Sequence, residues 1–173
     1  MEKDSVGGDT AVENRIGGVE AFETNLEEDA ADNLKIASRS MTLQDSLLTI
    51  AISSSGNPQI KAYAKQALER LKFQKNALHS FLTKNKVIPN EDLRTEQIDS
   101  LRWLSKQIGI SFYMPFNSQL SAEIRKTITA YKEAGHARQQ RVKASIKEEM
   151  PGVEKELDLL NALEINAHQN MAR

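Results

Sequence analysis

A chain of 173 residues is long enough for one domain with a sizeable core, since single domains usually have about 100–150 residues. Its 23 basic and 24 acidic side chains give a formal net charge of −1, so no overall basic field favours nucleic acid as a partner. Cysteine is absent, which excludes disulfides, thiolate zinc sites and a cysteine nucleophile and leaves the redox compartment open.

The first 18 residues differ in composition from the rest of the chain. They combine glycines with acidic and small polar residues and have few large apolar side chains. Because such a segment buries too little apolar surface to offset its ordering entropy, we expect a flexible polar leader or tether at 1–18 and a bundle domain at 19–173. No run of about 20 apolar residues is present, so we expect no transmembrane segment, and no export signal is visible. Whether Met1 stands in place of a removed signal segment stays open.

Apolar residues at steps of three and four predict four long helices, at 19–54, 58–86, 112–134 and 138–169. Asn57 and Pro58 suit the N-cap and first position of the second helix, and the short connection before them predicts that the first two helices are antiparallel neighbours. An amphipathic segment at 95–107 predicts a short crossover helix over the end of the bundle, ended by Gly109. Pro151 falls inside the last helix and predicts a kink or a short break.

The pattern as a whole predicts an all-α protein, an antiparallel four-helix bundle with a short crossover helix between its second and third helices. Strand content should be near zero because no alternation at period two is sustained. Trp103 is expected to plug the core, with a partner surface as the alternative, and Phe73 to widen the apolar face of the second helix. The side chains expected in the bundle core are Leu71, Ile124, Leu78, Leu120, Ile128 and Leu157.

One pair of residues has the spacing of a metal-binding motif. Metal sites in helical bundles use inward glutamates and a Glu-x-x-His pair on each of two helices. This sequence has one such pair, Glu133 and His136, with Gly135 between them and a predicted helix end beside them. One histidine and one carboxylate make an incomplete site, so we favour a surface pair without metal and predict no metal or other cofactor.

Residue patterns typical of catalysis are not found in the sequence. His79 flanks the core stripe of the second helix and is expected to be a hydrogen-bonded boundary residue rather than a base. A nucleophile elbow, a phosphate-binding glycine loop and a dinucleotide fingerprint are all absent. Basic residues at 138–147 are offset by acidic residues at 148–154, which favours a solvated face over a phosphate track. We therefore expect a protein that is not an enzyme and does not bind nucleic acid.

Three segments resemble the landmarks of a bacterial family: NPQIKAYA at 57–64, LSKQIGISFY at 104–113 and MPGVEKEL at 150–157. The family is a domain of unknown function, family forty-one forty-two, whose members are often labelled outer membrane proteins. The resemblance covers about residues 22–165, keeps the spacing between landmarks and depends most on the first segment. It implies a ferritin-like four-helix bundle that is exported to the periplasm or held at the outer membrane as a lipoprotein, with no established activity.

The resemblance also implies a histidine on each of the second, third and fourth helices. In this chain those positions fall on Leu71, Ile124 and Glu156, so the three histidines are absent. The first-helix glutamate that accompanies them falls near Gln44 or Ser46, so that carboxylate is absent as well. We therefore do not expect a metal or acid/base role at these positions.

Three functions from different classes remain open. The leading one is a non-catalytic bundle protein of the bacterial envelope that acts through surfaces or partners, with its partners and oligomeric state open. The second is a ferritin-like metal-binding or stress-related protein, which needs Glu133 and His136, or carboxylates such as Glu69 and Glu123, to converge inside the bundle. The third is a carrier of a small apolar ligand, which needs a cavity between the helices.

Overall fold

The computed structural model describes residues 25–171, with side chains up to residue 163, and over that range it consists of five helices and no strands. The helices are α2 (Glu28–Ser54), α3 (Pro58–Lys84), α4 (Thr95–Leu104), α5 (Ile110–Ala134) and α6 (Gln140–Met171). The all-α prediction is confirmed for this part of the chain, as is the short helix between the second and third long ones. The expected leader at 1–18 lies outside the described residues.

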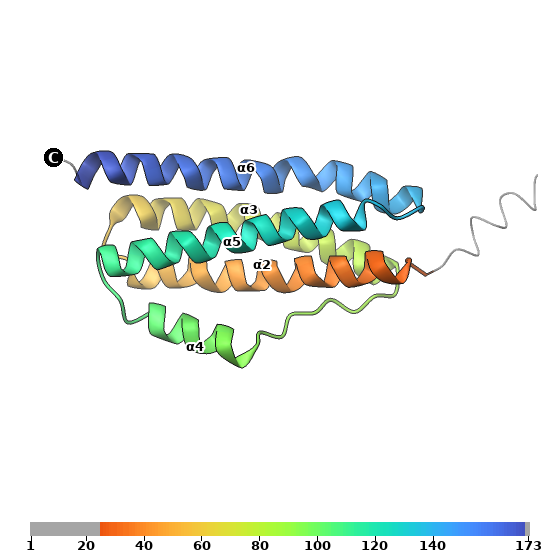
Figure 1. Cartoon of the computed structure of the whole chain (residues 1–173), viewed down its shortest axis with the longest axis horizontal. Helices are drawn as coiled ribbons and strands as arrows, with labels where there is room; N and C mark the ends of the chain where they lie inside the picture. Colours follow the sequence, from red (N-terminus) through yellow and green to blue (C-terminus); the bar gives the residue numbers. More distant parts are fainter. Residues whose placement is uncertain (1–24, 172–173) are drawn as a thin grey trace, which may run out of the picture.

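The four long helices lie side by side (Figure 1). The prediction that the short helix lies over the end of the bundle is wrong, because α4 lies along one side, against α2 and α5. Helix α2 packs against α3 and α5, and α6 packs against α5 and α3. Each of these neighbouring pairs is antiparallel, because the chain reverses between α2 and α3 and again between α5 and α6. The segment after α3 runs back along the outside of the molecule before α5 begins, so α3 and α5 point the same way.

Helix α2 begins later than predicted. The predicted helical start at residue 19 is wrong for residues 25–27, and residues 19–24 lie outside the described part. The N–H of Glu27 donates to Gln139 Oε1 at 3.1 Å, and its carboxylate accepts from the N–H of Arg138 at 2.9 Å. The carbonyl of Asn25 accepts from Gln139 Nε2 at 2.7 Å. Residues 25–27 with Arg138 and Gln139, here called the N-terminal clasp, thus form long-range bonds in place of a first helical turn.

Both ends of α3 have identifiable causes. The predicted N-cap is confirmed, since Asn57 Oδ1 accepts hydrogen bonds from the N–H groups of residues 59 and 60 at 2.8 and 3.3 Å. Pro58 occupies the first helical position, where its missing N–H removes no helical hydrogen bond. The helix ends at Lys84 rather than at residue 86, because Lys86 has a φ of 60° that no right-handed helix accommodates.

The boundaries of the later helices differ from the predictions by three residues or fewer. Helix α4 ends at Leu104 rather than at residue 107, and α6 begins at Gln140 rather than at residue 138. Gly109 is confirmed as a break, because its φ of 57° lies in the left-handed region and α5 starts directly after it, at Ile110. Of the kink or short break predicted at Pro151, the break is not observed, since α6 continues through that residue.

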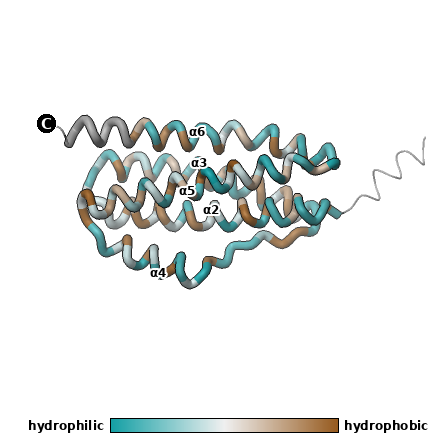
Figure 2. The backbone as a smooth tube through the Cα atoms, viewed as in Figure 1, coloured by the Kyte–Doolittle hydropathy of each residue, from teal (hydrophilic) through white to brown (hydrophobic). Residues whose placement is uncertain are grey.

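The core follows one apolar stripe on each long helix, visible as recurring brown segments in Figure 2. Leu71, Leu78, Leu120 and Ile124 are buried as predicted, each at most 4% exposed. The prediction for Phe73 is wrong, because this side chain is 78% exposed. Phe73 follows Leu71 by two residues, which places it about 200° around the helix, on the far side from the core.

Two further core predictions are wrong in degree. Ile128 and Leu157 are partly buried and pack against the edge of the core. On α6 the fully buried stripe passes through Val153, Glu156 and Leu160, with Leu157 one position to its side. The sequence pattern predicts Leu157 at the inward position, because it is the apolar residue four positions after Val153.

A polar seam joins α2 to α5 inside the bundle. Ser40 Oγ lies 2.7 Å from the carbonyl oxygen of Glu123 and 2.8 Å from its Oε2. Gln44 Nε2 donates to Thr127 Oγ1 at 3.0 Å, and both side chains are buried. Because an unpaired buried amide or hydroxyl costs about 1–3 kcal/mol, the seam disfavours sliding of one helix along the other.

None of the described helices combines the length and the apolar character needed to cross a lipid bilayer.

Candidate functional site

A partly buried ion pair joins α3 to α6 near the middle of both helices. Arg70 donates from Nε and Nη2 to the two carboxylate oxygens of Glu156, which is 6% exposed. The hydrogen bond to Glu156 raises the pKa of Arg70, so the guanidinium stays charged. Burial, reinforced by the charge of Glu156, raises the pKa of the nearby Tyr63 hydroxyl. Because the guanidinium engages both carboxylate oxygens, this arrangement is a tie between helices rather than an open acid/base site.

The positions at which the resemblance implies ligands do not form a ligand set here. Leu71 and Ile124 are each 2% exposed in the core, and Glu156 is paired with an arginine. Gln44 is buried in the polar seam, and Ser46 Oγ donates to a carbonyl of its own helix at 3.2 Å. Apolar packing and internal hydrogen bonds therefore occupy all of these positions.

Glu133 and His136 lie at the end of α5 and are both exposed. They line a pocket of about 330 Å³ together with Glu27 and Asp29, which the sequence did not associate with them. Glu27 already accepts a hydrogen bond from the backbone of Arg138. Among the residues with described side chains, no group of three or more carboxylates and histidines is arranged to hold a metal ion.

The other carboxylates considered for a metal site do not converge with this pair. Glu69 is exposed on α3, whereas Glu123 belongs to the polar seam and lies 3.8 Å from Lys126 Nζ. The convergence inside the bundle that a ferritin-like site requires is therefore not observed for these residues.

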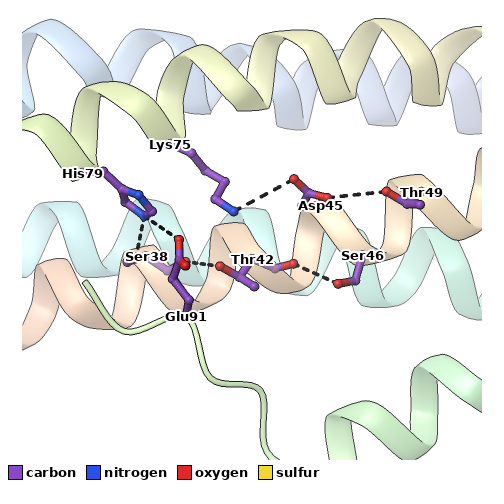
Figure 3. Close-up of polar contacts among 8 residues, drawn as sticks. All are labelled: Ser38, Thr42, Asp45, Ser46, Thr49, Lys75, His79 and Glu91. Carbon is purple, nitrogen blue, oxygen red and sulfur yellow. Dashed lines mark hydrogen bonds and ion pairs between the residues drawn. The ribbon is translucent and has the colours of Figure 1, made fainter. Parts of the chain in front are cut away.

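A serine, a histidine and a glutamate meet at the side of α2 (Figure 3). His79 Nε2 lies 3.2 Å from Ser38 Oγ and 3.3 Å from Glu91 Oε1, and the serine is fully buried. A catalytic triad needs the serine and the acid on opposite ring nitrogens, whereas here both contact the same nitrogen. The three side chains therefore link α2, α3 and the loop after α3. A second polar contact between α2 and α3 lies beside them, with Lys75 Nζ 4.0 Å from Asp45 Oδ2.

A surface groove of about 560 Å³ runs between α5 and α6. Its lining combines Arg125 and Lys132 on α5 with Glu154 and Asp158 on α6, beside the partly buried Ile128 and Leu157. The two positive and two negative side chains cancel, so the groove favours neither anions nor cations. Its charged lining also differs from the apolar cavity that a carrier of an apolar ligand needs.

Four large apolar side chains are exposed where α4 passes into α5. This connection lies at the end of the molecule opposite to the start of α2 (Figure 1). Trp103, Ile108, Ile110 and Met114 are 51%, 78%, 53% and 50% exposed, and we call them the apolar end surface. The prediction that Trp103 plugs the core is wrong. On α4 the buried stripe runs through Leu101 and Leu104, which points Trp103 away from the core.

Some residues that organise these sites were missed in the sequence. The steps from Val153 to Glu156 and on to Leu160 were a usable signal for an inward glutamate. Arg70, its partner, gave no signal of its own, because an arginine beside a core stripe is more often solvated. The sequence also gave no indication of the role of Gln139 in the N-terminal clasp, since its partners lie more than 100 residues away in the chain.

Comparison with known proteins confirms the family resemblance that the three landmark segments indicate. No curated protein matches the chain. The sequence profile of a family described as domain of unknown function DUF4142 matches residues 19–163, most of the chain. The chain therefore belongs to this family, DUF4142.

Proposed function

We propose that this protein is a non-catalytic, ferritin-like antiparallel four-helix bundle of the bacterial envelope, in the periplasm or at the outer membrane, and that it acts by binding a partner through its surface. The antiparallel packing of α2, α3, α5 and α6, with a long return segment between α3 and α5, supports the bundle class. The polar composition of residues 1–18, suited to a tether, supports the location.

The apolar end surface is the observation that carries the proposed mode of action. Single exposed apolar residues are ordinary, but here four large ones are close in the chain around one turn. Ser105, Lys106 and Ser111, which lie among them in the sequence, are exposed polar residues, and protein interfaces commonly combine apolar and polar side chains. Trp103 is an amphipathic aromatic of the kind enriched in binding hot spots.

Site-specific crosslinking in the native host tests this assignment. A photoreactive residue in place of Ile108 should give a discrete crosslinked product, and one in place of Ile88, which is 84% exposed in the loop before α4, should not. Trp103 is the only tryptophan of the chain, so its fluorescence emission should shift to shorter wavelength when the purified partner is added. Equal crosslinking at both positions, or none at either, would contradict the proposal.

Fractionation of cells that express the full-length gene product tests the location separately. The protein should appear in the periplasmic or outer-membrane fraction, and recovery in the cytosol alone would show that the envelope assignment is wrong. This result does not depend on the crosslinking experiment, so the two parts of the proposal can fail independently.

A metal-binding role is the second candidate, favoured by a pocket that brings Glu27, Asp29, Glu133 and His136 together. Titration with ferrous iron, manganese and zinc, followed by calorimetry, distinguishes it from the leading proposal. Stoichiometric micromolar binding that is lost in Glu133→Ala or His136→Ala would establish the metal-binding role. Weak binding that survives both substitutions would instead indicate loose association with surface carboxylates.

A further inference from the structure

We propose that a pocket between α2, α4 and α5 binds a small phosphate-type oxyanion. The pocket has a volume of about 240 Å³ and lies where α4 begins beside the two long helices. Helix α2 contributes an apolar wall through Ile36, and each of the three helices or its cap contributes one basic residue. The full lining is Ile36, Arg39, Ser40, Arg94, Gln97, Glu123 and Lys126.

Positive charge exceeds negative charge in this pocket. Arg39, Arg94 and Lys126 carry three positive charges against one negative charge on Glu123. That carboxylate is already engaged, with Oε2 lying 2.8 Å from Ser40 Oγ and Oε1 3.8 Å from Lys126 Nζ. The chain as a whole has a net charge of −1, so the excess is local and does not follow from a generally basic surface.

Arg39 brings to the pocket a charged group for which the described part of the protein supplies no acceptor. Its Nε is buried and has no hydrogen-bond partner among the described residues, and no ion pair involves its side chain there. Arg141 is a useful contrast, because its Nε is also buried and unpaired but its Nη2 donates to the carbonyl of Asn25 at 3.3 Å. The Nε atom itself is closed to solvent, so an oxyanion in the pocket would instead pair with the charge of this guanidinium, which has no partner among the described residues.

The size and lining of the pocket define the class of ligand. A volume of about 240 Å³ equals the share of about eight water molecules in the liquid, at about 30 Å³ each. It falls below the range of about 300–1,000 Å³ typical of pockets for drug-sized molecules. A guanidinium presents its N–H groups in a planar fork that suits phosphate oxygens. Gln97 supplies a neutral amide, and Glu96 in the same turn is exposed and does not line the pocket.

Thermal unfolding at constant ionic strength tests the proposal on the full chain. Inorganic phosphate should raise the unfolding midpoint progressively with its concentration, whereas chloride should not, because a ligand that binds only the folded state stabilises it. Arg39→Gln should reduce the phosphate affinity measured by calorimetry at least about tenfold, and Arg39→Lys should fall between this variant and the wild type. Arg102→Gln is the matched control, since Arg102 is exposed on α4 and paired with Asp99 at 3.1 Å.

Arg39→Met distinguishes a binding role from a structural one. If Arg39 serves a ligand, this variant should be at least as stable as the wild type without phosphate and should no longer respond to phosphate. A wild type that responds equally to phosphate and chloride, or an Arg39→Gln variant that responds like the wild type, would overturn the proposal. A response to citrate but not to phosphate would overturn the phosphate assignment. Tighter binding of glycerol phosphate than of inorganic phosphate would identify a phosphate monoester as the source of the oxyanion.

Discussion

At the scale of single residues, Arg70 and Glu156 form the contact that the sequence least suggested. Replacing Arg70 with Met leaves the Glu156 carboxylate buried without its partner. We expect this variant to lose about 3 kcal/mol of unfolding free energy, at the lower end of the range for buried pairs because the Arg70 side chain is one-third exposed. Urea denaturation measures the change.

The double variant Arg70→Met with Glu156→Leu is the control for this prediction. It removes both charges and replaces them with apolar side chains, so it should be more stable than Arg70→Met alone. The single variant Glu156→Leu completes the comparison. A loss of stability in the double variant equal to the sum of the losses in the two single variants would show that the two residues are not coupled.

Glu149 offers a prediction on pH. Burial, reinforced by the neighbouring charge of Glu148, raises the pKa of the Glu149 carboxyl in the folded protein. Folding therefore favours the protonated form, and the resulting stabilisation is present at low pH and is lost as the pH rises through the folded-state pKa. Glu149→Gln should accordingly be slightly more stable than the wild type at pH 7, and the gain should be small because Glu149 is only partly buried and solvent screens its charge.

The same comparison near pH 3, below the ordinary glutamate pKa of about 4.3, should show no difference, because Glu149 is then protonated in both states. Midpoints of thermal unfolding across this pH range provide the measurement. Glu69→Gln, at an exposed position on α3, should show no comparable gain at pH 7. A Glu149→Gln variant that is less stable at pH 7 would contradict the prediction.

At the scale of the elements, two turn glycines form a matched pair. Gly109 has a φ of 57°, whereas Gly56 has no positive φ, and a Cβ at either position would meet no atom within 4 Å. Gly109→Ala should therefore cost about 1–3 kcal/mol through backbone strain, because its φ of 57° and ψ of −133° are sparsely populated by residues other than glycine. Gly56→Ala should cost nothing or stabilise slightly by restricting the unfolded chain. Chemical denaturation of both variants measures the free energy of unfolding. Equal losses in the two variants would indicate that the positive φ of Gly109 is not the cause of the destabilisation.

The helices were predictable where local rules operate. The Asn57 cap, Pro58 and Gly109 each work through the backbone of their immediate neighbours, and the apolar steps that define the long helices are equally local. The start of α2 was not predictable, because its cause is the clasp with residues more than 100 positions later in the chain. Trp103 was misplaced because a helix of ten residues allows its apolar stripe to be drawn in more than one way.

The candidate sites were less predictable than the helices. The sequence identified Glu133 and His136 but not Glu27 and Asp29, which join them only through the packing of α2 against α5. The pocket of Arg39, Arg94 and Lys126 draws on three elements, each carrying a basic residue that is unremarkable by itself. Such sites form from residues of different helices, and the spacing of residues along one helix does not predict which of them will meet.

At the scale of the whole molecule, the core should respond as one cooperative unit. Leu71→Ala and Ile124→Ala each remove buried methyl groups from residues that are 2% exposed, so each should cost about 2–5 kcal/mol. Phe73→Ala, only two residues from Leu71 but 78% exposed, should change stability by less than about 0.5 kcal/mol. Wild-type-like thermal midpoints for both core variants would show that these positions do not support the fold.

The N-terminal clasp has a mechanical consequence. A force applied to the chain ahead of Asn25 reaches Gln139 and Arg138 before it reaches the first turn of α2, because the hydrogen bonds at residues 25–27 lie first along the path. The load is thus divided between the start of α2 and the connection from α5 to α6, two places far apart in sequence. The hydrogen bonds of the clasp therefore bear this load before the first turn of α2 does. A protein held by its N-terminal segment would thus resist the unfolding of α2 from its first turn onward.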